Sequence, residues 1–68
     1  MEKALKFTDR EMDIINGLVK GSSNEKIGNE LFLSGHTVKS HLENIYQKIN
    51  VHNRVQLVVY LFKNGIIT

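Results

Sequence analysis

The stretch SGHTVKSHLENIYQKI, in the second half of the chain, carries polar side chains at the spacing of one helix face. A helix turning about 100° per residue places these side chains together, and the members of this outer face are His36, Ser40, Glu43 and Gln47, with Lys39 at the edge. Only Lys39 and Glu43 can form an i,i+4 charge pair, and their order along the helix is the weaker one. The face therefore holds hydrogen-bond donors and acceptors that the helix itself does not need.

The opposite side of the same expected helix is apolar. Val38, Leu42, Ile45 and Ile49 recur at steps of four, three and four residues, the spacing of a stripe that packs on a core. His41 lies about 60° from the centre of that stripe by the same helical count, so we expect it to pack against the core. This helix must therefore be held from one side by the rest of the fold.

Length and composition limit what the fold can be. A chain of 68 residues without cysteine is one small domain that has no disulfide or thiolate zinc site to stabilise it, and a deep substrate pocket is not expected. The start, MEKALKF, is too short and too charged for a signal peptide, and no apolar run approaches the roughly 18 residues of a membrane span. We therefore expect a cytoplasmic protein with no membrane contact.

The net charge of +2 is unevenly distributed along the chain. Between His36 and Arg54 there are three basic residues and one acidic residue, whereas the remainder holds six of each. All three histidines also lie in this window, but His36 and His41 point to different faces and His52 lies in a loop, so no metal site is expected. The excess of positive charge thus coincides with the helix that carries the outer face, as polyanion binding requires.

Capping signals predict the first two helices. Thr8 and Glu11 have the spacing of a capping box, and Gly21 is a natural stop for the helix that follows. Its expected apolar face is formed by Met12, Ile14, Ile15, Leu18 and Val19. Ser22 and Glu25 form a second box, which predicts the start of a short helix there.

Two further helices complete an all-α fold. Ser34 is expected to cap a helix over about 35–49, and Asn53 with Gln56 to cap one that runs to Asn64. Gly65 suits the left-handed position after this last helix, with Ile66 closing onto Leu61. Residues 1–6 are expected to be a tail or a linker stub, and residues 7–68 a four-helix bundle.

The second and third helices are joined by residues 32–34 alone, which forces them to cross sharply. This arrangement is the helix-turn-helix. Gly28, inside the second helix, costs about 1 kcal/mol against alanine, which suggests that another backbone passes close to it. In a helix-turn-helix, the second of the two helices presents its outer face to the DNA major groove. Here that helix is the one expected over about 35–49, so its outer face is interpreted as a DNA-reading surface.

The segments FTDRE, GSSNEKIGNELFLSGHTVKSHLENIYQKINV, NRVQ and NGII resemble the DNA-binding domain of the LuxR, FixJ and NarL type, also called GerE-like. The resemblance covers about Phe7 to Ile67. It implies a bacterial transcription regulator in which the third helix binds DNA and the fourth often mediates dimerisation. It also implies that Lys39, Ser40 and Glu43 face bases, and that the DNA backbone is contacted by Asn24, Lys26, Thr37, Lys48 and Arg54.

Three of these assignments have alternatives. Glu43, where relatives usually have a basic or neutral residue, either accepts a hydrogen bond from a cytosine amino group or pairs with Lys39 and holds it in place. Ser40 either bonds a base or only permits close approach. Thr37 either donates to a phosphate or forms a local bond with the backbone.

The fourth helix has more apolar residues than one core-facing stripe requires. Leu57 and Leu61, where relatives usually have alanine, form one group, and Val55, Val59 and Phe62 form a second group around the helix. If the first group packs on the domain, the second is available for a weak homodimer. Which group dimerises remains open at this point.

The expected partners are double-stranded DNA, an identical chain and, as a further candidate, RNA polymerase, with no cofactor and no small-molecule ligand. The alternatives are a helical protein-interaction adapter that uses the apolar surface of the fourth helix, and a small hydrolase, for which no nucleophile, metal or phosphate-loop motif is present. The sequence is compatible with a stand-alone regulator and with the output domain of a response regulator.

Overall fold

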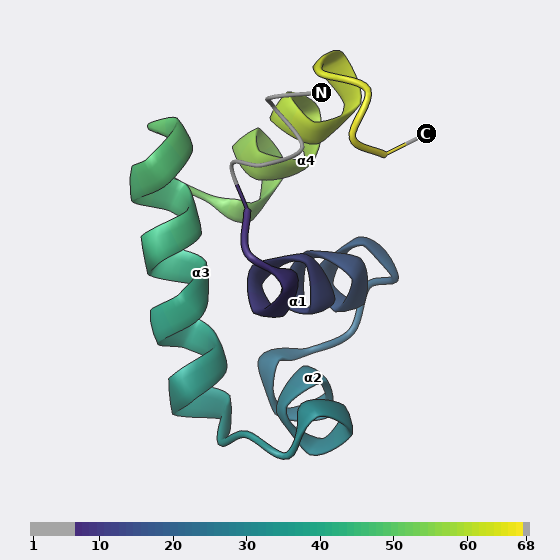
Figure 1. The fold of residues 1–68 in the computed structure, drawn as a ribbon, viewed down its shortest axis with the longest axis vertical. Coiled ribbons are helices and arrows are strands. Elements are labelled where there is room, and N and C mark those ends of the chain that lie inside the picture. Colours follow the sequence, from purple (N-terminus) through teal and green to yellow (C-terminus); the bar gives the residue numbers. More distant parts are fainter. Residues whose placement is uncertain (1–6, 68) are drawn as a thin grey trace.

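The computed structural model describes residues 7–67, which form four helices and no strand (Figure 1). The helices are α1 (Asp9–Val19), α2 (Asn24–Leu31), α3 (Gly35–Ile49) and α4 (Arg54–Lys63). The predicted all-α fold is confirmed, and none of these four helices is long and apolar enough to cross a membrane. The expected tail, residues 1–6, and Thr68 lie outside the described residues.

Helix α1 begins and ends where its sequence signals predict. The Thr8 hydroxyl accepts from the Glu11 N–H (3.1 Å), and the Glu11 carboxylate accepts from the Thr8 N–H (2.9 Å). At the other end Gly21 has a φ of +88°, and the N–H groups of Gly21 and Ser22 donate back to Leu18 and Gly17. This is the Schellman arrangement, which satisfies the last carbonyls of the helix.

The predicted start of α2 is wrong by one residue. Ser23, rather than Ser22, is the N-cap, and its hydroxyl accepts from the Lys26 N–H (3.1 Å). The Ser22 N–H closes the end of α1 on the Gly17 carbonyl, so it is not available to the Glu25 side chain as the predicted box requires. The two capping motifs therefore occupy consecutive residues.

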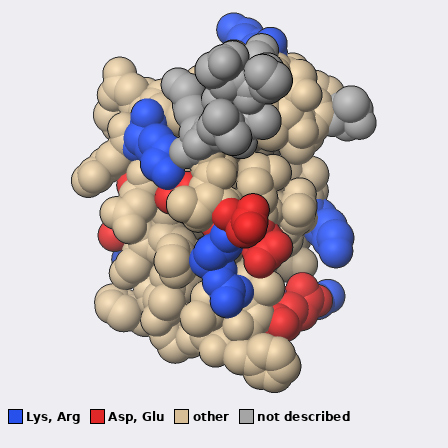
Figure 2. Space-filling view, in the orientation of Figure 1, with Lys and Arg blue, Asp and Glu red and all other residues tan. Residues whose placement is uncertain are grey.

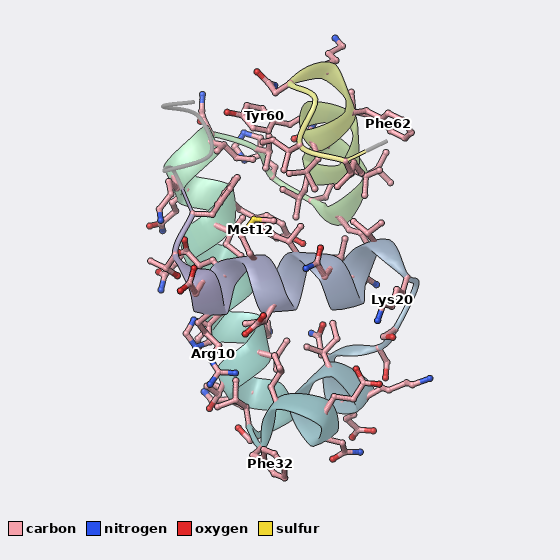
Figure 3. The ribbon with its side chains drawn as sticks, turned by 45° about the vertical axis from the view of Figure 1, so that its right-hand side comes forward. Arg10, Met12, Lys20, Phe32, Tyr60 and Phe62 are labelled. Carbon is pink, nitrogen blue, oxygen red and sulfur yellow. The ribbon has the colours of Figure 1, made fainter. Side chains whose placement is uncertain are left out.

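The connection between α2 and α3 is as short as predicted, residues 32–34. Phe32 takes the left-handed conformation (φ 61°). This residue is 95% exposed, and its side chain projects away from the helices (Figure 3). The Leu33 N–H then donates to the Gly28 carbonyl (2.8 Å), and the Ser34 hydroxyl caps α3. A Cβ on Gly28 would lie 2.4 Å from the Leu33 carbonyl oxygen, which confirms the close backbone approach inferred from the glycine.

The core lies between the inner faces of the four helices. From α3 it takes Val38, Leu42 and Ile45, as the apolar stripe predicts, while Ile49 is half-buried. From α1 it takes Ile14, Ile15 and Leu18, with Met12 partly buried against them (Figure 3). Val19 was expected in this face, but it is the last residue of α1 and is 42% exposed.

Helix α4 buries one of its two apolar groups. Leu57 and Leu61 are fully buried, whereas Val55, Val59 and Phe62 are 70%, 45% and 59% exposed. The Asn53 side chain caps the Gln56 N–H as predicted, but the Gln56 side chain accepts from His52 instead of completing the box.

The C-terminal end of α4 closes as predicted. Gly65 takes the left-handed conformation, with a φ of +69°. The Ile66 N–H donates to the Leu61 carbonyl (2.9 Å), which returns the chain to the core and leaves Ile66 partly buried against it.

The contact at Gly28 predicts a strong substitution effect. Gly28→Ala should lower the free energy of unfolding by about 1 to 3 kcal/mol, because the added Cβ meets a backbone oxygen that cannot move without opening the turn. Urea unfolding measures this loss. Gly35→Ala is the matched control: its Cβ would lie 3.4 Å from the flexible Glu25 side chain, so a change within about 0.5 kcal/mol is expected. Equal effects for both variants would contradict the role of the close contact.

Candidate nucleic-acid interface

The outer face of α3 is exposed along its length. Lys39, Ser40 and Glu43 are exposed, and so are His36 and Gln47, while Val38 on the other side of the helix is fully buried. His41, expected to pack against the core, is half-buried. Within residues 7–67 no ion pair joins Lys39 to Glu43, so both charged groups are available to another molecule.

Thr37 lies at the beginning of α3 and takes part in the cap. Its N–H donates to the Ser34 hydroxyl (3.0 Å), and that hydroxyl donates to the Thr37 side-chain oxygen (2.9 Å). The Thr37 side chain is therefore bonded locally, but to the Ser34 side chain and not to the backbone as the alternative reading of the sequence had it. Because Thr37 Oγ1 is the acceptor in this bond, the hydroxyl hydrogen of Thr37 can still be donated outward.

The beginnings of α2 and α4 lie next to each other. The Arg54 guanidinium, at the first residue of α4, donates to the Ser22 carbonyl just before α2 (3.2 Å). Asn24 is half-buried and Lys26 is exposed in the first turn of α2. N–H groups at the beginning of a helix attract anions, and Arg54 reaches the residue that precedes the N-cap of α2, the helix whose first turn carries Asn24 and Lys26.

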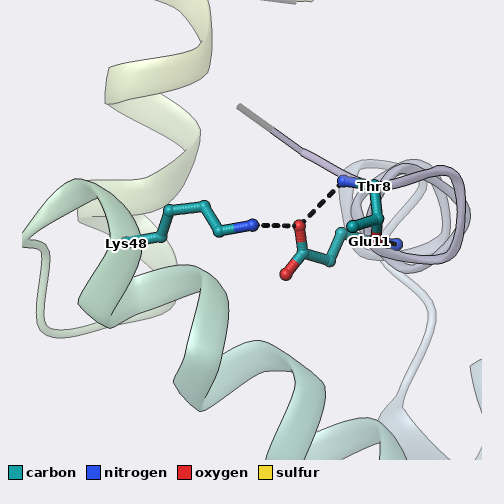
Figure 4. Close-up of polar contacts among 3 residues, drawn as sticks. All are labelled: Thr8, Glu11 and Lys48. Atoms are coloured by element: carbon teal, nitrogen blue, oxygen red, sulfur yellow. Dashed lines mark hydrogen bonds and ion pairs between the residues drawn. The ribbon is translucent and has the colours of Figure 1, made fainter. Parts of the chain in front are cut away.

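Lys48 has a different environment from the one expected. Its ammonium contacts Glu11 Oε1 at 2.6 Å, and that oxygen also accepts from the Thr8 N–H (Figure 4). The ammonium lies 5.9 Å from the centre of the Phe7 ring, a cation–π distance. Lys48 therefore ties the last turn of α3 to the beginning of α1, although its side chain remains 34% exposed.

The Glu11 carboxylate is nearly buried, with 10% of its side chain exposed. Burial alone would raise the pKa of Glu11, but the hydrogen bonds from Lys48 and Thr8 and the positive charge of Lys48 outweigh burial and lower the pKa below its ordinary value of 4.5. The sequence predicted the bond to Thr8 through the capping box. It gave no signal for the bond to Lys48, which lies 37 residues away.

The face seen in Figures 1 and 2 has no continuous basic patch. Basic and acidic side chains lie next to one another there, among a larger area of uncharged residues (Figure 2). The net charge of +2 is likewise small.

The sharp α2–α3 turn, the buried inner face of α3 and its exposed polar outer face define a helix-turn-helix domain. Residues 5–61 match the family described as "Bacterial regulatory proteins, luxR family", and the chain belongs to this family. The predicted resemblance is confirmed.

Relatives of the chain are regulators of transcription. The uncharacterized transcriptional regulatory protein YxjL of Bacillus subtilis is 42% identical over 66 residues, 97% of this chain and 30% of the relative. The transcriptional regulatory protein DegU of Brevibacillus brevis is 47% identical over 59 residues, 87% of this chain and 25% of the relative. The CsgBAC operon transcriptional regulatory protein of Escherichia coli is 48% identical over 63 residues, 93% of this chain and 29% of the relative. The chain thus spans less than a third of these proteins.

The pair between Glu11 and Lys48 predicts a pH-dependent contribution to stability. Folding keeps Glu11 ionised to a lower pH than in the unfolded chain, so the contribution is complete above about pH 4.5 and is lost as the pH falls through the lowered pKa. Glu11→Gln should cost about 1 kcal/mol at pH 7, since Lys48 is partly screened by solvent, and progressively less below pH 4.5.

Urea unfolding of both proteins at pH 7 and pH 3 measures this difference. Glu30→Gln, which changes an exposed carboxylate of α2, is the control and should change stability by less than about 0.5 kcal/mol at either pH. A deficit of Glu11→Gln that is the same at both pH values would show that the ionised carboxylate contributes nothing.

Proposed function

We propose that this chain is a sequence-specific DNA-binding domain whose helix α3 enters the major groove. The observation that carries the proposal is the division of α3 into a buried apolar side and an exposed polar side. A major groove about 12 Å wide admits one helix and displays base-edge donors and acceptors. Family membership and the names of the relatives, which are transcriptional regulators, support the same function.

The proposed roles follow the position of each side chain. Lys39, Ser40 and Glu43 read bases from the exposed face of α3. The phosphates are positioned by residues at the beginnings of α2, α3 and α4 and at the end of α3, namely Asn24, Lys26, Thr37, Lys48 and Arg54. Lys48 and Arg54 already have intramolecular partners, but an ammonium has three donors and a guanidinium five, so each can also approach a phosphate.

Base reading and phosphate contact can be separated by mutation. Lys39→Ala should weaken binding to the best site by about 1 to 3 kcal/mol and relax its specificity, whereas Lys26→Ala should weaken all sequences alike and lower the salt slope by about one. Both lysines are exposed, so neither substitution should unfold the chain. Titrations of the preferred site and of random DNA at several salt concentrations measure the two effects. Equal losses on both DNAs for both variants would contradict the division of roles.

A second proposal concerns dimerisation through α4. Val55, Val59 and Phe62 form an exposed apolar surface on the side of α4 away from the core (Figure 3 shows Phe62 projecting outward). Two copies joined here by a two-fold axis would place two α3 helices about one DNA turn apart on an inverted repeat. Three side chains form a small contact, so we expect a weak dimer that DNA stabilises.

Val59→Glu tests this surface. The variant should remain folded, since Val59 is 45% exposed, and bind one half-site while losing cooperative binding to a full inverted repeat. Leu61→Glu, on the fully buried side of the same helix, should instead unfold the chain. Circular dichroism and titration of half and full sites distinguish these outcomes. Cooperative binding by Val59→Glu would show that this surface does not form the dimer.

The same apolar surface supports a second candidate function, a helical adapter that binds another protein. RNA polymerase is one candidate partner of this kind, and in either case the chain acts in the cytoplasm, at the nucleoid. We propose that the chain works either as the output domain of a longer regulator or as a stand-alone regulator. The first alternative is supported by the length of the relatives, which is more than three times that of the aligned region. DNA binding that fails even at low salt would favour the adapter.

A further inference from the structure

Glu43 is the one acidic residue in α3. The other charged residues of the helix are Lys39 and Lys48, and Lys48 is already paired with Glu11. A carboxylate on a helix that approaches phosphates is repelled by them unless it meets a hydrogen-bond donor. Its position on the exposed face therefore needs an explanation in terms of the bound DNA.

The structure removes the internal explanation for Glu43. In residues 7–67 no hydrogen bond or ion pair engages its carboxylate, although Lys39 lies one turn away on the same helix. The order of the two residues, with the lysine first, also opposes the helix dipole and is the weaker arrangement for an i,i+4 pair. Glu43 is therefore not explained as a residue that holds Lys39 in place.

Base chemistry leaves one good partner for a carboxylate in the major groove. Guanine presents the acceptors N7 and O6, thymine presents the acceptor O4, and adenine presents its N6 donor directly beside the N7 acceptor. Cytosine presents the 4-amino donor without a neighbouring acceptor on the same base. A carboxylate is thus attracted by cytosine and disfavoured by the other three bases.

Lys39 can reach a guanine close to that cytosine. Four residues of helix advance about 6 Å, less than two base-pair steps of 3.4 Å, and the side chain between them, Ser40, is small. An ammonium donates well to guanine O6 and N7. We infer that Glu43 restricts the DNA site to a C·G pair by accepting a hydrogen bond from the cytosine 4-amino group, with Lys39 donating to a guanine within two base-pair steps.

This inference rests on the proposed function, and it is tested by selecting duplexes from a randomised library. The wild-type chain should enrich one cytosine per half-site within two base pairs of the guanine that depends on Lys39. Glu43→Ala should lose the preference at that position alone, and Glu43→Gln, whose amide also donates, should admit adenine there. Gln47→Ala, one turn further along the same face, is the matched control and should still select the cytosine.

A second measurement isolates the amino group. Replacing the selected cytosine by an analogue that lacks the 4-amino group should weaken wild-type binding about tenfold and leave Glu43→Ala unaffected. Glu43 is exposed, so circular dichroism should show both variants folded.

The outcomes separate this inference from the proposed function. Continued cytosine selection by Glu43→Ala overturns the inference, and so does a loss of the guanine preference alone, which would mean that Glu43 acts through Lys39. If the wild-type chain selects a site in which no cytosine depends on Glu43, the inference is wrong and the proposed function stands. If the wild-type chain selects no DNA sequence, the proposed function is contradicted as well.

Discussion

The fold depends on a backbone contact that leaves no room for a side chain. The Leu33 carbonyl approaches Gly28 so closely that a Cβ there would lie 2.4 Å away. This contact, with the Leu33 N–H bonded to the Gly28 carbonyl, fixes how α3 leaves α2. Because α3 is then held by its apolar side, its polar side must face outward. The exposure of Lys39 and Glu43 is thus a consequence of packing at a glycine in another helix.

The two lysines of α3 show how the same residue type can have different uses in one helix. Lys48 lies beside the entry of α1, where a nearly buried carboxylate and an aromatic ring hold its ammonium. Lys39 has no such neighbour in the described chain, although Glu43 lies one turn away. The difference arises because the nearly buried Glu11 is also held by its bond to Thr8, whereas Glu43 is exposed to solvent.

Helix termini carry much of the organisation of so small a domain. Three of the four helices begin with a Ser or Thr cap, and the fourth begins with Asn53. The beginnings of α2 and α4 are linked through a hydrogen bond from Arg54 to the Ser22 carbonyl.

The local features could be read from the sequence with good success. The four helices, the box at Thr8, the left-handed turns at Gly21 and Gly65 and the inner stripe of α3 all depend on residues within a few positions of one another, for which short-range patterns suffice. The one-residue error at Ser22 arose where two caps share neighbouring residues. The bond between Lys48 and Glu11, the exposure of Val19 and the choice of which apolar group of α4 is buried could not be read in this way. Each depends on which helices meet in space. The period of apolar residues in a sequence shows which residues share one face of a helix, but not which other helix covers that face.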